Sequence, residues 1–214
     1  MKAIIFDLDG TLVDSAPGIL NAFARTFSDC GLEPVVPLIP GMIGPPLRDT
    51  LQHLAGVADS HLLDQLTTVF KAHYDSASYL ETQPFPGVET MLVTLAAAGL
   101  DLHVATNKRA YPTQRILAHL GWTTFFNQVY ALDLFNPPLP NKTALLARLL
   151  TDTDLDAAQC VYVGDRQEDG QAARANHLTF CWAAWGFGAV PDQEEAVEGI
   201  LLRYPDPQIM LNLA

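Results

Sequence analysis

The chain has 214 residues and a formal net charge of −12, from 24 acidic and 12 basic residues. An acidic chain without a basic cluster suits neither nucleic acid nor an anionic membrane surface, so we expect neither as a partner. Hydrophobic residues make up 49% of the chain, which is typical of a globular protein, and the length allows one sizeable core with a smaller appendage. An anionic substrate would need local cations here, because the overall field repels it.

The cysteines and the apolar runs bear on the cellular compartment. Cys30, Cys160 and Cys181 show no metal-ligand spacing, and the last two lie in apolar runs, where a free thiol behaves as a small hydrophobe. The N-terminal residues do not form a signal peptide, and no apolar run is long enough to span a bilayer. We therefore expect a cytoplasmic protein, and the sequence leaves open whether it is a monomer or a homodimer.

Residues 2–14, KAIIFDLDGTLVD, combine a short apolar run with two acids. The run predicts a buried strand, and strand periodicity places Asp7 and Asp9 on the same side at its carboxyl end. Buried carboxylates need a cation, and Mg²⁺ prefers oxygen ligands. Gly10 lets the chain turn where a side chain would obstruct a ligand. The alternative is an ordinary strand followed by an Asp-Gly turn.

Residues 15–83 are predicted to be entirely helical. Ser15 is expected to cap a first helix with Pro17 in its first turn, and Gly31 ends it. A proline-rich loop that includes residues 41–47 follows, and then come helices over residues 47–54 and 60–79. This pattern predicts a helical cap domain of residues 15–83, inserted into a core domain formed by residues 1–14 and 84–214.

From residue 84 the chain alternates between helices and strands. Strands are predicted over residues 100–105, 128–132, 159–163 and 178–183, with helices over residues 87–98, 111–120, 141–150, 168–175 and 192–202. Alternation at this spacing predicts an α/β fold with a doubly wound parallel sheet, covered by helices on both faces.

Polar groups follow several of the predicted strands. Thr106 and Asn107 end one strand, Lys142 begins a helix, and Asp165 and Asp169 follow another strand. Taken singly, these residues suit a turn, a helix cap, a surface lysine or an acid in a first helical turn. Ligands of open parallel sheets bind at the carboxyl ends of the strands, so together these groups predict one polar rim.

That rim suits phosphoryl transfer, in which catalysis is mostly positioning and charge neutralisation. We expect Mg²⁺ to be held by Asp7, Asp165 and the backbone carbonyl of Asp9. Lys142 would neutralise the phosphate, and the Thr106 hydroxyl with nearby amides, including those at Gly10 and Asn107, would bind its oxygens.

The sequence resembles the haloacid dehalogenase superfamily of hydrolases, and within it the phosphoglycolate phosphatase-like branch. The DxDGT motif matches residues 7–11, a strand ending in Thr matches Thr106, a lysine before a helix matches Lys142, and GDxxxD matches residues 164–169. The helical insert lies where the family has its C1-type cap, and the core is expected to be Rossmann-like. The surroundings of Lys142 depart from the Lys-Pro-x-Pro form common in this branch.

The resemblance implies a reaction and roles for these residues. Asp7 would be the nucleophile that forms an aspartyl-phosphate, and Asp9 would be the acid and then the base. Asp169 of the last motif would join Asp7, Asp9 and Asp165 at the metal. Family dehalogenases lack the second aspartate of the first motif, so the presence of Asp9 favours phosphatase over dehalogenase activity.

The substrate is expected to be a small phosphorylated metabolite such as phosphoglycolate, selected by the cap. Arg48, just beyond the loop of residues 41–47, is a candidate partner for a substrate carboxylate or second phosphate, and the alternative is a solvated helix residue. Rival functions are a phosphosugar mutase, a pyrophosphatase, a phosphonate hydrolase, or a catalytically silent binding module on the same scaffold.

Overall fold

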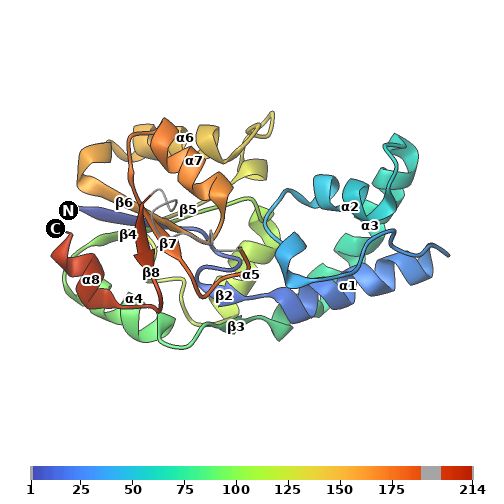
Figure 1. Ribbon diagram of the computed structural model, residues 1–214, viewed down its shortest axis with the longest axis horizontal. Coiled ribbons are helices and arrows are strands. Elements are labelled where there is room, and N and C mark those ends of the chain that lie inside the picture. The colour runs from blue at the N-terminus through green and yellow to red at the C-terminus, as the bar shows by residue number, and fades with distance from the viewer. Residues whose placement is uncertain (1, 189–198, 214) are drawn as a thin grey trace.

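Six parallel strands form the sheet at the centre of the computed structural model, which describes residues 2–188 and 199–213. Their order across the sheet is β5-β4-β1-β6-β7-β8, and every neighbouring pair is parallel. The strands are β1 (Ala3–Phe6), β4 (Asp101–Thr106), β5 (Gln128–Ala131), β6 (Cys160–Gly164), β7 (Thr179–Ala183) and β8 (Ile200–Leu202). The predicted α/β parallel sheet is confirmed, and the first strand of the chain occupies its middle (Figure 1).

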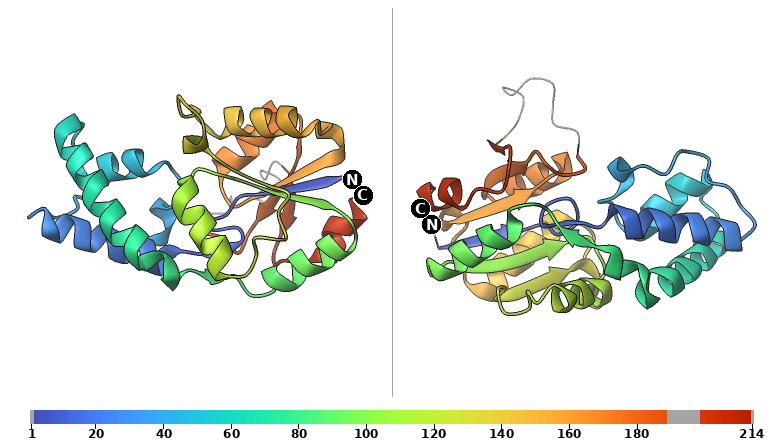
Figure 2. Two further views of the ribbon diagram at one scale, coloured as in Figure 1. Left: turned by 180° about the vertical axis from the view of Figure 1, so that it is seen from behind. Right: turned by 90° about the horizontal axis from the view of Figure 1, so that it is seen from below.

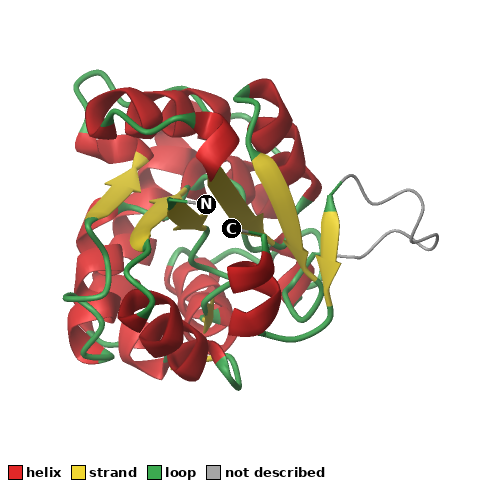
Figure 3. Ribbon diagram, turned by 90° about the vertical axis from the view of Figure 1, so that its left-hand side faces the viewer, coloured by secondary structure: helices red, strands yellow, loops and turns green. Residues whose placement is uncertain are grey.

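Both faces of the sheet are covered by helices (Figure 3). Alternating residues of β1 enter two separate apolar clusters, Ile4 and Phe6 in one and Ala3 and Ile5 in the other, because strand side chains alternate between faces. The first cluster includes residues of α4 (Val88–Ala97), α5 (Ala110–His119) and α8 (Pro207–Asn212), and the second includes residues of α6 (Lys142–Thr153) and α7 (Gln167–Ala175). The sheet is therefore doubly wound.

The remaining long helices lie beside the sheet and not on its faces (Figures 1 and 2). They are α1 (Ala16–Asp29), α2 (Leu47–Ala55) and α3 (Ser60–Ser76). Their apolar residues Phe23, Leu66 and Phe70 are buried against one another. Short 3-10 turns occur at Pro40–Met42, Ser78–Glu81, Leu132–Leu134 and Ala157–Gln159.

A two-stranded antiparallel ladder joins the helical region to the sheet region. It pairs β2 (Val13–Asp14) with β3 (Gln83–Pro84), where the chain leaves the sheet region and where it returns. These crossings coincide with the boundaries predicted for the cap and the core. The division into two domains remains a prediction, and we use "cap" below for residues 15–83 and "core" for the rest.

Two local predictions differ from the structure. Residues 192–198 of the predicted final helix lie outside the described residues, and Ile200–Leu202 form strand β8 because they pair with β7. Ser15 stands before α1 but does not cap it with its side chain, since its hydroxyl donates to Asp9 instead. Within residues 2–188 and 199–213, no helix combines the length and the apolar character needed to cross a membrane.

Candidate active site

Asp7, Thr106 and Asp165 lie at the carboxyl ends of the three central strands. Asp7 directly follows β1, Thr106 ends β4 and Asp165 directly follows β6. Phe6 pairs with Val104 on one side and with Val163 on the other, so the in-register strands end at the same edge of the sheet. All three side chains are buried there.

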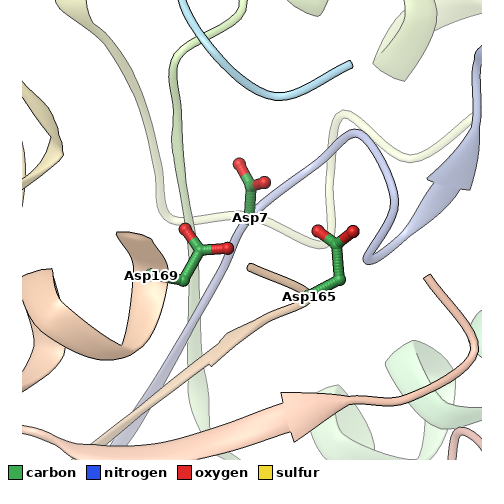
Figure 4. A group of neighbouring side chains, drawn as sticks. All are labelled: Asp7, Asp165 and Asp169. Carbon is green, nitrogen blue, oxygen red and sulfur yellow. The ribbon is translucent and has the colours of Figure 1, made fainter. Parts of the chain in front are cut away.

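Asp169, in the first turn of α7, completes a cluster of buried acids. Asp7, Asp165 and Asp169 each offer an oxygen within 4.8 Å of the others, and their carboxylates extend to the same side of the sheet edge (Figure 4). Burial raises the pKa of Asp7 to about 7, although the Lys142 ammonium lowers it. Burial also raises the pKa of Asp165 to about 6, and the nearby Asp169 adds to that increase.

Lys142 lies between two of these acids. It is the first residue of α6, which Asn141 caps by accepting a hydrogen bond from the Ala144 amide. The Lys142 ammonium is 2.9 Å from Asp7 Oδ1 and 2.9 Å from Asp169 Oδ1. Burial alone would lower the pKa of Lys142, but Asp169 and Asp7 raise it further than burial lowers it. Lys142 therefore carries a positive charge in the site.

Asp169 positions Lys142 through its other contacts. Its Oδ1 accepts hydrogen bonds from both Lys142 and the Tyr162 hydroxyl, and its Oδ2 accepts one from the Arg166 amide at 3.0 Å. Both oxygens of Asp169 thus have donors from the chain itself. This carboxylate is held in place by the start of α7 and by β6, and it in turn fixes the ammonium beside Asp7.

The loop after β7 closes around Asp165. The amides of Phe187 and Gly188 donate to Asp165 Oδ2 at 2.8 and 3.0 Å, and Thr11 donates to Oδ1. A Cβ at Gly188 would overlap the Asp165 backbone oxygen. Gly10 has a φ of 85°, and a Cβ there would overlap the Asp165 carboxylate. The loop that contains Phe187 and Gly188 therefore packs directly beside the acids.

Asp9 is held by groups that differ from those around Asp7. Lys108 donates to Oδ1 at 3.1 Å and to Oδ2 at 3.2 Å, and the Ser15 hydroxyl donates to Oδ1. The Lys108 ammonium also lies 4.6 Å from the centre of the Tyr74 ring, which belongs to the cap. Lys108 therefore connects the Asp9 carboxylate with the cap helix α3.

The cap covers the acids through the loop that precedes α2. Asn107 Nδ2 donates to the Gly44 carbonyl at 3.0 Å, and the Arg166 guanidinium donates to the carbonyls of Gly41 and Ile43. This loop and the helices α1 and α3 share one pocket with Asp7, Asp9, Thr106 and Asn107. Ile43, Gly44, Pro45 and Leu47 thus line the same pocket as Asp7 and Asp9.

Most of the predicted site residues meet at this edge of the sheet. They are Asp7, Asp9, Gly10, Thr106, Asn107, Lys142, Asp165 and Asp169. Arg48 is the exception, because its exposed guanidinium pairs with Asp64 on the cap and it does not line the pocket. The structure thus supports the alternative of a solvated helix residue for Arg48.

Sequence reasoning missed Lys108, Arg166 and the paired Arg109 and Asp75. Lys108 follows a strand end by two residues, which was a usable signal, and Arg166 directly follows Asp165. Arg109 donates to both carboxylate oxygens of Asp75, a cap residue on α3. No sequence pattern indicates that Arg109 pairs with a residue 34 positions away in the chain.

The acid cluster fits a divalent cation. Three carboxylates and the Lys142 ammonium leave two formal negative charges in a buried space, and two positive charges would balance them. The Lys142 ammonium, 2.9 Å from Asp7 Oδ1, is the one cation among the described residues that lies between these acids, so it balances only part of their charge. An all-oxygen donor set is the one that Mg²⁺ prefers.

An α/β sheet with clustered aspartates at its carboxyl edge and helices above them is the arrangement of hydrolases that use aspartate carboxylates in catalysis beneath a cap. The family model for haloacid dehalogenase-like hydrolases matches residues 4–183. The chain belongs to this family.

Similar proteins include several named phosphatases. A phosphoglycolate phosphatase of Xanthomonas campestris is 33% identical over 212 residues, which cover 97% of this chain and 94% of that protein. The tyrosine-protein kinase PtkA of Mycobacterium tuberculosis is 32% identical over 188 residues, covering 87% of this chain and 63% of that one. A haloacid dehalogenase-like hydrolase from Streptococcus pneumoniae superposes with a TM-score of 0.85 at 28% identity, covering 100% and 99% of the two chains.

Family membership and the phosphatase relatives establish the general activity. The protein is a hydrolase of phosphoric monoesters.

Proposed function

We propose that the protein is a Mg²⁺-dependent phosphatase that hydrolyses a small phosphomonoester through an aspartyl-phosphate on Asp7. The proposal is carried by one observation: Asp7 is buried beside Lys142, Asp165 and Asp169 and also lines the pocket under the cap. A nucleophile in this position lies beside the Lys142 ammonium and also faces the pocket in which a substrate can bind.

The other residues take roles that follow from their contacts. Asp9, oriented by Ser15 and Lys108, protonates the leaving oxygen and later draws a proton from the attacking water. Thr106 and the amide groups near Gly10 and Asn107 bind phosphate oxygens at the strand ends.

Asp7, Asp165, Asp169 and the Asp9 backbone carbonyl would hold a divalent cation, which would supply charge neutralisation to the phosphate. Lys142 contributes the remaining positive charge beside Asp7. Arg48 is left out of the proposed site because it pairs with Asp64.

The test compares Asp7→Asn with Asp64→Asn, an equal change on the exposed cap surface. We expect Asp7→Asn to lose phosphate release by at least a factor of about 1,000, since a carboxamide cannot serve as the nucleophile. Asp64→Asn should keep wild-type turnover, and EDTA should silence the wild type until Mg²⁺ is added back. Retained activity in Asp7→Asn would exclude it as the nucleophile, and activity in EDTA would exclude the metal.

The measured product separates the rival functions. Release of inorganic phosphate from a monoester supports the phosphatase, whereas retention of the phosphoryl group on a bisphosphate would indicate a mutase. Pyrophosphate and a phosphonate belong on the same substrate panel. A protein that releases phosphate from none of them would be a silent binding module.

Phosphoglycolate is the substrate suggested by the names of several relatives. The same group of relatives includes a 5'-nucleotidase of Pseudomonas aeruginosa, 28% identical over 187 residues, so the alcohol released is not fixed by likeness. A cytoplasmic location and a monomeric or homodimeric state remain predictions.

A further inference from the structure

The pocket above Asp7 and Asp9 has an uncharged wall on the cap side. Cap residues that line it are Ile19, Phe23, Ile43, Gly44, Pro45, Leu47, Thr50, Phe70 and Tyr74. None of them bears a charge at neutral pH, and only Thr50 and Tyr74 bring a polar side-chain atom. The alcohol part of a phosphomonoester bound to Asp7 would face this wall, because the core side of the pocket is occupied by the acids.

Aromatic rings form a continuous row along that wall. The ring centres of Phe23 and Phe70 are 4.6 Å apart, and those of Phe70 and Tyr74 are 5.5 Å apart with an angle of 14° between their planes. Phe23 lies on α1 and the other two lie on α3, so the row joins the two helices that cover the site. The rings of Phe23 and Phe70 favour apolar groups and give a carboxylate no donor, and the wall as a whole offers no charge to pair with one.

The cations that line the pocket already have carboxylate partners. Among the described lining residues they are Lys108 and Arg109. Lys108 pairs with both oxygens of Asp9, and Arg109 donates to both oxygens of Asp75. A negatively charged leaving group would lose its hydration here without gaining an unpaired cation, and the desolvation of an unpaired charge is costly.

We propose that this enzyme prefers phosphomonoesters of uncharged, apolar alcohols over anionic esters such as phosphoglycolate. The inference rests on the proposed function, because it assigns the leaving-group side of the same pocket. The phosphate is neutralised at the sheet edge, and the cap wall selects the alcohol by excluding charge.

The first experiment uses substrates that differ only in charge. Ethyl phosphate becomes phosphoglycolate when its terminal methyl is replaced by a carboxylate, and n-butyl phosphate can be paired with its terminal carboxylate in the same way. We expect kcat/KM for each neutral ester to exceed that of its anionic partner at least tenfold, which is about 1.4 kcal/mol. The carboxylate of phosphoglycolate makes its alcohol the better leaving group, so intrinsic reactivity opposes the expected preference.

Two outcomes separate the inference from the proposed function. If phosphoglycolate is hydrolysed as well as ethyl phosphate or better, the inference is overturned while the phosphatase stands. If none of the esters releases phosphate, the proposed function fails and the inference fails with it.

A matched pair of variants tests the role of the paired cations. Asp75→Asn removes the charge that neutralises Arg109 at the pocket, and Asp64→Asn does the same for Arg48 outside it. Both positions lie on α3. We expect Asp75→Asn to raise the ratio of kcat/KM for phosphoglycolate over ethyl phosphate about fivefold or more, and Asp64→Asn to leave it unchanged. An equal ratio in Asp75→Asn and wild type would contradict the inference.

Discussion

Removing the charge of Lys142 should lower the free energy of unfolding of the metal-free protein. The change Lys142→Met keeps most of the side-chain volume and deletes the charge between Asp7 and Asp169. Two unit charges 2.9 Å apart attract by about 6 kcal/mol at an effective dielectric constant of about 20, and Lys142 has two such contacts. Because desolvation of the buried ammonium offsets much of this, we expect a net loss of about 3–5 kcal/mol in the free energy of unfolding.

The assay is thermal and denaturant unfolding in EDTA and in Mg²⁺. For a chain of this length, the expected loss corresponds to a fall in Tm of about 6–20 °C without metal. Mg²⁺ should restore more stability to Lys142→Met than it adds to the wild type, because the variant leaves the acids with one more uncompensated negative charge. Lys71→Met, at an exposed position on α3, is the matched control. A Lys142→Met protein that is no less stable than Lys71→Met in EDTA would refute the electrostatic reasoning.

Two further predictions follow from the surroundings of the acids. The pKa values of Asp7 and Asp165 are raised to about 7 and about 6, so the folded metal-free protein holds protons that the unfolded chain loses near pH 4. Its stability should fall as the pH rises from about 4 to 7, and the Mg²⁺-induced increase in Tm should grow over the same range; a constant increase would contradict the raised pKa values. Gly188→Ala should weaken Mg²⁺ binding at least tenfold in calorimetry, because its Cβ would displace the loop from Asp165, whereas Gly41→Ala, with its nearest neighbour at 3.9 Å, should bind normally. Equal affinities in the two variants would show that the loop does not orient Asp165.

The sheet edge could be predicted because its signals are local. Asp7 and Asp165 each follow an apolar run that ends in a turn, and Thr106 ends such a run itself. In a parallel sheet, those three strand ends must face the same side, so spacing along the chain was enough to bring them together. Lys142 required the family motif as well, since a single lysine before a helix is usually a surface residue.

The partners of charged side chains could not be predicted in the same way. Arg48 and Arg109 each directly follow a residue that lines the pocket in the sequence. In the structure, Arg48 pairs with Asp64 within the cap and does not line the pocket, whereas Arg109 lines it and pairs with Asp75. Which carboxylate a long side chain reaches depends on how the helices pack, and α3 supplies the partner in both cases.

The prediction of a helix over residues 200–202 was wrong for a related reason. Ile200–Leu202 is an apolar run of three residues, which suits the end of a helix as well as a strand. The exposed edge of β7 decides between them, because it offers backbone partners that only an extended segment can use.

The central position of β1 has a consequence for folding during synthesis on the ribosome. Its neighbours, β4 and β6, begin at Asp101 and Cys160, so β1 leaves the ribosome about 100 residues before its first hydrogen-bonding partner and about 160 residues before its second. Loop closure over such separations is slow, and an unpaired apolar strand invites aggregation. Nascent chains of this protein should therefore depend on chaperones until residue 164 has emerged, whereas the local contacts of α1 to α3 can form much earlier.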